Sequence, residues 1–346
     1  MIICHPFRII KRDFCRLTAL LHTGLRLENI LKYINTLKEG DRGTETYLCK
    51  KKTQGISKTG KAFESLTLCD KTGTIDAKIW DVDSEGISDY DELDFITVTG
   101  DITSWNGALQ FNIKRLRKAN DGEFEISDYI PSSKKDVNVM WNDLTALINS
   151  IQAPYMKTLL RKYFVEDKAF IEAFKAHSAA KSVHHGFTGG LLEHTLSVAT
   201  NCDYFSKQYP FLDRDLLITA AIFHDIGKVK ELSDFPRNDY TDEGQLLGHI
   251  YVGATMVDRT IDEIEGFPAV KRKELIHCIL SHHGELEFGS PKKPAIAEAI
   301  ALSFADNLDA KLETIYEALE NVEENNLTWQ GFNRLLDSNI RRTGKN

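Results

Sequence analysis

The stretch LLITAAIFHDIGK, residues 216–228, begins as a run of apolar residues and ends in ionisable ones. Its first eight residues are nearly all apolar, which is typical of a helix in the core of an all-α domain. His224, Asp225 and Lys228 then follow within five residues. Ionisable groups in apolar surroundings need a partner, and a metal ion is a good one. The stretch therefore predicts a buried helix that carries metal ligands.

Two other segments with helical patterns carry residues of the same types. His194 lies in GGLLEHTLSVAT (189–200), and Asp306 lies in AIAEAIALSFADNLDA (295–310). Imidazole nitrogen and carboxylate oxygen suit Mn²⁺, Fe²⁺, Co²⁺ or Zn²⁺. A single histidine of this kind is more often a structural core residue or a helix cap. The four residues together favour a metal site held by helices.

Three more histidines lie between the His-Asp pair and Asp306. His249 is in GQLLGHIYVGA (244–254), and His282 and His283 are in CILSHHGELEFGSPKKP (278–294). The combined set exceeds what one ion needs, so we expect two ions. Because adjacent residues on a regular helix point about 100° apart, it stays open which of His282 and His283 binds directly.

The order of these residues resembles the HD-domain superfamily of metal-dependent phosphohydrolases, in its binuclear branch with several histidines. The resemblance covers about residues 160–320. It implies that Asp225 bridges two ions, one bound also by His194, His224 and Asp306, and the other by His249, His282 and His283.

Two bridged metal ions indicate hydrolysis of a phosphate ester, because they activate water and bind the phosphoryl oxygens. Lys228, one turn after Asp225, would then lie near the developing negative charge. The alternative is that Lys228 is a solvated lysine at a helix C-terminus. The metals do not say whose phosphate is cleaved, so the substrate must be inferred from the rest of the chain.

The N-terminal third has a β pattern. The runs 44–54, 57–81 and 95–116 alternate or are β-rich, and the turns KTGK, DKTGT and WNGAL have glycine at hairpin positions. Five strands without a long helix between them predict a small closed barrel, and their order suggests an OB-fold.

Aromatic and basic residues alternate along this barrel, as they do where bases stack and phosphates are neutralised. The candidates for contact with a strand of nucleic acid are Phe63, Trp80, Trp105, Phe111 and Lys114. The alternative for each one is a core aromatic or a solvated edge-strand lysine. A barrel joined to a phosphodiesterase favours nucleic-acid binding for the domain as a whole.

A glycine-rich turn precedes His194 and is a second candidate for substrate contact. His184 and His185 come before Gly189-Gly190, and a turn of this kind leaves backbone N–H groups free to meet phosphate. It is equally consistent with a tight start of the helix. Lys292 and Lys293, after His283, are candidates that could also be ordinary solvated loop residues.

The two halves together resemble the YhaM-type 3′ to 5′ exoribonucleases. The resemblance lies in YINTLKEGD (33–41), FESLTLCDKTGTIDAKIWD (63–81), AAKSVHHGFTGGLLEHTLSVA (179–199), AIFHDIGKVKE (221–231), GHIYVGA (248–254) and residues 281–311. It implies removal of nucleoside 5′-monophosphates from single-stranded RNA, usually with Mn²⁺. Fe²⁺, Co²⁺ and Mg²⁺ are alternative ions, and single-stranded DNA is an alternative substrate. Spacing alone does not show the substrate.

Two other functions stay open. One is an HD-type nucleotide phosphohydrolase or cyclic-dinucleotide phosphodiesterase, since the fold of the catalytic domain does not fix its substrate. The additional barrel disfavours this function. The other is a nucleic-acid-binding protein with a degenerate hydrolase domain, which the complete set of seven ligands disfavours.

The patterns together divide the chain into four parts. We expect an extension at 1–28, an OB-fold at 29–125, a linker and connecting helix at 126–155 and an HD domain with C-terminal helices at 156–346.

The net charge of −8 means that local patches and metal ions must capture RNA. Six scattered cysteines indicate buried thiols rather than disulfides. No apolar run is long enough for a signal peptide or membrane span, so we expect a cytoplasmic protein; whether it is a homo-oligomer stays open.

Overall fold

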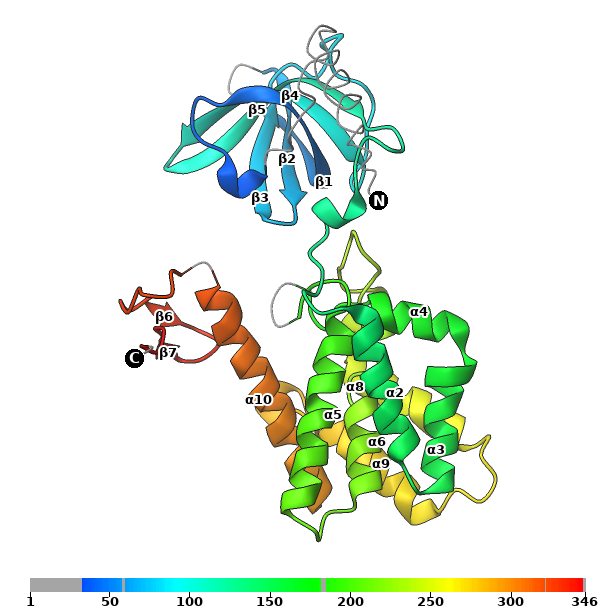
Figure 1. Ribbon diagram of the computed structural model, residues 1–346. Coiled ribbons are helices and arrows are strands. Elements are labelled where there is room, and N and C mark those ends of the chain that lie inside the picture. The colour runs from blue at the N-terminus through cyan, green and yellow to red at the C-terminus, as the bar shows by residue number, and fades with distance from the viewer. Residues whose placement is uncertain (1–32, 58–59, 182–184, 321, 345–346) are drawn as a thin grey trace, which may run out of the picture.

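The computed structural model describes residues 33–57, 60–181, 185–320 and 322–344. The first 28 residues, for which we expected an extension, lie outside these ranges. The described chain forms a β-barrel followed by a helical domain, and the two are separate bodies joined by the segment after residue 118 (Figure 1). This arrangement confirms the predicted combination of fold classes.

The barrel has five strands in the closed order β1-β2-β3-β5-β4. Their bounds are β1 Arg42–Ile56, β2 Ala62–Asp70, β3 Gly73–Ile79, β4 Phe95–Trp105 and β5 Ala108–Lys118. All neighbours are antiparallel except β3 and β5, which pair in parallel. Closure through one parallel pair in this order is the OB-fold topology.

Alternation along the strands fills the barrel. On β2, Glu64, Leu66 and Leu68 are buried, while the residues between them are half-buried and face outward. The β4–β5 hairpin turns at Asn106 and Gly107, both with positive φ (52° and 82°), which explains the Asn-Gly signal in the sequence. One shared core holds the barrel, including the buried ring of Tyr47.

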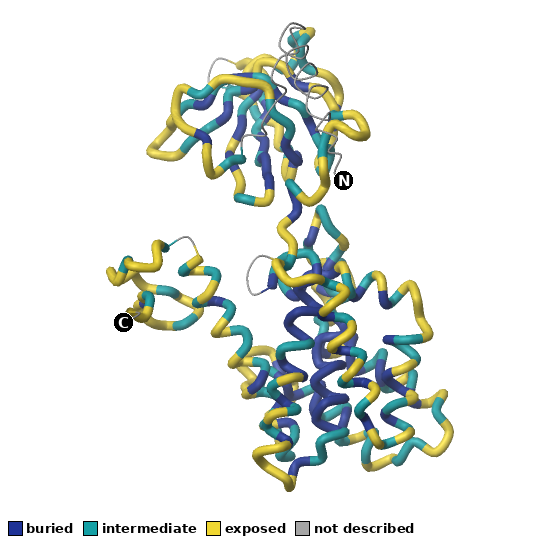
Figure 2. The backbone as a smooth tube through the Cα atoms, in the orientation of Figure 1, coloured by how far each residue is buried: buried dark blue, intermediate teal, exposed yellow. Residues whose placement is uncertain are grey.

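The helical domain packs around α5 and α6, whose residues are largely buried (Figure 2). Its helices are α2 Val137–Ser150, α3 Pro154–Arg161, α4 Lys168–Ala176, α5 Gly190–Gln208, α6 Arg214–Phe223, α7 Lys228–Glu231, α8 Asp242–Ile261, α9 Ala269–Ser281 and α10 Ala297–Leu319. A π-helical turn at Lys162–Glu166 separates α3 from α4. A single core cluster spans the domain.

The residues after α10 form a short hairpin rather than further helices. Its strands are β6 Phe332–Asn333 and β7 Ser338–Asn339, beside the C-terminal end of α10 (Figure 1). None of the described helices is both long enough and apolar enough to cross a membrane. Cys49, Cys69, Cys202 and Cys278 are buried free thiols, as expected.

Candidate functional site

Three of the seven predicted ligands lie within helices, and the other four directly follow helix ends. His194, His249 and Asp306 lie in α5, α8 and α10. Helix α6 ends at Phe223, so His224 and Asp225 occupy the turn that follows it. Helix α9 ends at Ser281, so His282 and His283 also follow a helix end. The prediction that these two pairs sit within regular helices is therefore wrong.

One group of ligand atoms comes from α5, α10 and the turn after α6. The Nε2 atoms of His194 and His224 are 3.1 Å apart, and His194 Nε2 is 3.2 Å from Asp306 Oδ1. Asp225 Oδ2 completes the group at 3.4 Å from His194 Nε2 and 3.3 Å from His224 Nε2. All four predicted ligands of the first ion are therefore together.

A second group brings His249, His282 and His283 within 4.8 Å of one another through one ligand atom each. The other carboxylate oxygen of Asp225, Oδ1, lies 3.4 Å from His249 Nε2 and 3.6 Å from His282 Nε2. One carboxylate thus faces both groups, each with a different oxygen. His282 and His283 both belong to the second group, so the positions of both are compatible with direct binding.

The fit to metal ions follows from how the imidazoles are held. Nδ1 of His224, His282 and His283 lies 2.7 Å from the backbone oxygens of Ala221, Ile279 and Phe288, respectively. An imidazole that donates from Nδ1 presents a lone pair at Nε2. The buried Nε2 atoms of His249 and His282 and Oδ1 of Asp225 make no hydrogen bond to any described residue. Lone pairs that face one another in a buried site need a cation between them, so these residues suit divalent metals.

Two carboxylates that the sequence reasoning missed orient the remaining histidines. Asp309 Oδ2 lies 2.7 Å from Nδ1 of His194, and Glu231 Oε1 lies 2.9 Å from Nδ1 of His249. Such partners fix the tautomer and orientation of ligating imidazoles. Their signal in the sequence was a second acid one turn from an already identified residue, Asp309 after Asp306 and Glu231 after Lys228.

The ionic state of the centre follows from this packing. Burial by itself would raise the pKa of Asp225, but Lys228 and His224 hold it well below its usual range. Burial lowers the pKa of His283 to about 4, so its imidazole is neutral at pH 7. A carboxylate anion and a neutral imidazole are the forms that bind a metal.

Lys228 is the first residue of α7 and points toward the ligands. Its Nζ lies 2.6 Å from Asp225 Oδ2, and only 15% of its side chain is exposed. It therefore contributes a cation at the centre and is not the solvated lysine of a helix C-terminus.

The substrate contacts predicted around the glycine-rich turn have a different outcome. His184 lies outside the described residues. His185 is buried, with Nε2 3.0 Å from Asp309 Oδ2, so it supports the acid that holds His194 and the prediction of substrate contact is wrong. A Cβ at Gly190 would lie 2.0 Å from the backbone oxygen of His185, so the glycine allows this tight approach. Lys292 is exposed, and Lys293 pairs with Glu285.

The outer face of the barrel carries an aromatic pair. Phe63 and Trp80 have ring centroids 5.3 Å apart, and Trp80 is 51% exposed. Phe63 lies over Gly55 on the neighbouring strand, where a Cβ would be 2.6 Å from the ring. Lys78, which the sequence reasoning missed, places Nζ 5.5 Å from the Phe63 centroid. The pair with its lysine has the composition of a base-stacking surface.

The other barrel candidates differ in position. Trp105, at the β4–β5 hairpin, is 69% exposed. Phe111 is 2% exposed and packs edge-on against Tyr47, so the prediction that it contacts substrate is wrong. Lys114 is exposed, but its Nζ pairs with Asp101 at 2.6 Å. Pairing of this kind recurs in the basic clusters of the barrel, at Lys118 with Asp94 for example, and reduces their net positive charge.

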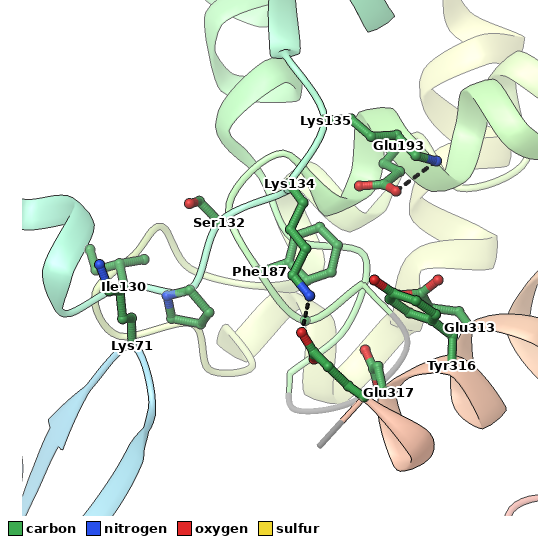
Figure 3. Close-up of a pocket in the computed structure, with 13 residues that line it drawn as sticks. Lys71, Ile130, Ser132, Lys134, Lys135, Phe187, Glu193, Glu313, Tyr316 and Glu317 are labelled. Atoms are coloured by element: carbon green, nitrogen blue, oxygen red, sulfur yellow. Dashed lines mark hydrogen bonds and ion pairs between the residues drawn. The ribbon is translucent and has the colours of Figure 1, made fainter. Parts of the chain in front are cut away.

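A cavity of about 780 Å³ lies where the barrel, the connecting segment and α10 approach one another (Figure 3). None of the seven ligands lines it. Lys134 pairs with Glu320, which directly follows α10, and Lys135 pairs with Glu193 of α5 at 2.9 Å. The cavity therefore marks a salt-bridged junction, separate from the metal ligands.

The helical domain matches a known family. The family model described as HD domain matches residues 191–311, which include all seven ligands. The second OB-fold domain of replication protein A from Methanococcus maripaludis is similar to the barrel. It has 20% identity and a TM-score of 0.22, and the alignment covers 28% of this chain and 100% of that one. The OB assignment itself rests on the strand order.

Similarity to whole proteins extends over both domains. Proteins named 3′-5′ exoribonuclease YhaM from Bacillus velezensis and from a Geobacillus species are 36% and 38% identical to this chain. The alignments cover 85% and 81% of this chain and 92% and 86% of the relatives. The protein of that name from Bacillus subtilis is 35% identical, over 85% of this chain and 92% of its own. At this identity and coverage, the chain belongs to the YhaM family of 3′-5′ exoribonucleases.

Proposed function

We propose that this protein is a metal-dependent exoribonuclease that shortens single-stranded RNA from its 3′ end and releases nucleoside 5′-monophosphates. The main observation in support is that Asp225 faces two groups of candidate metal ligands, one with each carboxylate oxygen. The relatives of the chain are named 3′-5′ exoribonucleases. When bound, two divalent ions supply activated water and Lewis acidity toward the scissile phosphate. Imidazoles and carboxylates suit several divalent ions, and Mn²⁺ is the one that we propose because the resemblance to the family implies it.

The residues of the site have three proposed roles: binding the ions, stabilising negative charge and orienting the imidazoles. His194, His224 and Asp306 would hold one ion and the three histidines of the second group the other, with Asp225 facing both groups. Lys228 places a fixed cation beside that carboxylate, where it can stabilise the negative charge that develops on the phosphate. Asp309 and Glu231 keep the imidazoles in the metal-binding orientation.

The barrel supplies affinity for the strand. Phe63, Trp80 and Trp105 offer aromatic surface to unpaired bases, and stacking contributes about 1–3 kcal/mol per base without sequence preference. A chain with net charge −8 needs such contacts more than a basic protein does. The same surface accepts single-stranded DNA, since every base has a stacking face.

The test uses purified protein, Mn²⁺ and a 5′-labelled single-stranded RNA, with Asp225→Ala in parallel. A ladder that keeps the 5′ label and shortens with time, absent for the variant and after chelation of the metal, supports the proposal. Intact RNA together with rapid cleavage of mononucleotides or cyclic dinucleotides would replace it with the phosphohydrolase function. Protein that purifies without metal and cleaves none of these substrates would identify a non-catalytic RNA-binding protein.

A further inference from the structure

Helix α10 carries an apolar stripe that begins against the core at Ala297 and Ala301 and is exposed from Phe304 onward. Leu302 and Ala305 are buried against the neighbouring helices, whereas Phe304, Leu308 and Leu312 are 67%, 43% and 58% exposed. The stripe continues with the following apolar residues at spacings of three and four, which keep to one side of a helix: Ala297, Ala301, Phe304, Leu308, Leu312, Ile315 and Leu319. No described residue covers its centre, which lies along the outer edge of the domain (Figures 1 and 2).

The order of side chains along the stripe is self-complementary. If the helix is turned end for end about Leu308, Phe304 falls opposite Leu312 of an identical helix and Ala301 falls opposite Ile315. Ala297 falls opposite Leu319, and Leu308 meets itself. Every position is therefore apolar in both copies, and each alanine receives a bulky aliphatic side chain. A parallel arrangement would instead set Ala301 against Ala301 and leave a gap.

A hollow lies where this pairing requires one. A cavity of about 470 Å³ opens over the alanine end of the stripe, between α10 and the C-terminal part of α5. Ala297 and Ala301 form its floor, and Phe205, Tyr209 and Phe211 contribute apolar walls. Antiparallel pairing brings the bulky end of a second stripe, Ile315 and Leu319, over this hollow. Interfaces of stable oligomers pack such projections into matching holes.

The exposed apolar area is large enough for a dimer. Around the stripe, Tyr209 and Phe211 are 54% and 75% exposed, and Ile300 is 47% exposed. At about 200 Å² for an aromatic side chain and somewhat less for an aliphatic one, these residues and the stripe expose roughly 600 Å² per chain. That equals the largest apolar patches of ordinary monomers. Two copies would bury roughly 1,200 Å², the lower end of specific interfaces.

We propose that the protein is a two-fold symmetric dimer in which α10 of one chain packs antiparallel against α10 of a second copy, centred on Leu308. The isologous geometry follows from the self-complementary stripe, because a two-fold axis places the same patch on both sides of an interface. Residues of the metal centre take no part in the contact, so the dimer is independent of the proposed function.

The first test measures mass in solution by light scattering coupled to gel filtration, for the full chain at micromolar concentration. The expected result is a dimer, and Leu308→Glu, which sets two carboxylates against each other on the two-fold axis, weakens it at least tenfold. Val270→Glu is the matched control, since Val270 is also an exposed aliphatic residue (65%, against 43% for Leu308) but belongs to α9 and not to the stripe. A monomeric wild-type chain overturns the proposal, and so does a Leu308→Glu variant that stays dimeric.

Cross-linking tests the orientation. Under oxidation, Leu308→Cys forms a dimer through its own disulfide, because only the residue on the axis meets itself. Leu312→Cys cross-links only when mixed with Phe304→Cys. The wild-type chain gives the background from its own cysteines. Self-linking of Leu312→Cys, or failure of Leu308→Cys to link in a chain that is dimeric, would rule out the antiparallel arrangement.

Discussion

Replacing Asp309 by asparagine should selectively weaken the first metal site. The carboxylate of Asp309 accepts from three groups, His194 Nδ1 at 2.7 Å, His185 Nε2 at 3.0 Å and the hydroxyl of Ser197. An amide has one acceptor oxygen and a donor NH₂ in place of the second oxygen. At least one of the three donors therefore loses its acceptor, and His194 loses the anion that favours its metal-binding tautomer.

The expected loss of metal affinity at the first site follows from the position of Asp309. The side chain does not touch an ion, and Asn keeps its shape, so the effect is that of losing an orienting hydrogen bond. Such partners are worth about 10–100-fold in metal affinity, which corresponds to about 1.4–2.8 kcal/mol. The second site, held by His249, His282 and His283, should change less than about threefold, because Glu231 rather than Asp309 holds its first histidine.

Calorimetric titration of metal-free protein with Mn²⁺ resolves the two sites. Glu231→Gln is the reciprocal variant and should weaken the second site while sparing the first. Asp258→Asn is the matched control, since Asp258 is also ion-paired, to Arg272, but lies on the outer side of α8. Equal losses at both sites in each variant would refute the reasoning, as would an Asp309→Asn variant that keeps its fold and binds both ions with wild-type affinity.

Three further outcomes are expected. Phe63→Ala and Trp80→Ala should each weaken binding of single-stranded RNA about fivefold to 100-fold, as measured by fluorescence anisotropy. Hydrolysis of a small chromogenic phosphodiester should be unchanged, and an equal loss of activity on that ester would contradict a role in base stacking. Burial lowers the pKa of His194, but hydrogen bonds to three carboxylates outweigh burial and raise it well above its usual value. The metal-free imidazole then keeps its proton above pH 6.5, so Mn²⁺ affinity should rise from pH 6 to 8 with proton release, seen as a binding enthalpy that depends on the buffer. Gly227→Ala places a Cβ 2.1 Å from the backbone oxygen of His249, so it should destabilise the protein by about 1–3 kcal/mol, and an unchanged melting temperature would contradict this packing.

The ligands were predictable because their signal is local. His224 and Asp225 interrupt an apolar helix, and ionisable residues rarely follow such a run without a reason. The barrel was predictable for a similar reason, since the glycine turns and the alternation lie within each hairpin. The ends of α6 and α9 were not, because the helical pattern continues past Phe223 and Ser281 while the backbone turns to bring the ligands together.

The errors in substrate contacts have two physical causes. Phe111 shares its side of β5 with Ile113 and Leu109, so alternation already indicated the core, and its aromatic character was given too much weight. His185 is different, because its partner Asp309 is 124 residues away and no local pattern reveals that contact. Residues that orient ligands depend on tertiary structure, so their positions emerge only when the fold is known.

Helix α10 joins the metal centre to the proposed dimer through two patterns in one sequence. Asp306 and Asp309, one turn apart, both contact His194 of α5: the first lies beside its Nε2 in the first ligand group, and the second holds its Nδ1. The apolar stripe centred on Leu308 lies on a different side, about 160° around the helix from Asp306 and about 100° from Asp309. Substitutions can therefore disrupt metal binding and dimerisation separately. Leu308→Glu should yield a monomer that still binds both ions, whereas Asp309→Asn should yield a dimer with one weakened site. A monomer that also loses the first ion would mean that pairing is needed to hold α10 in place.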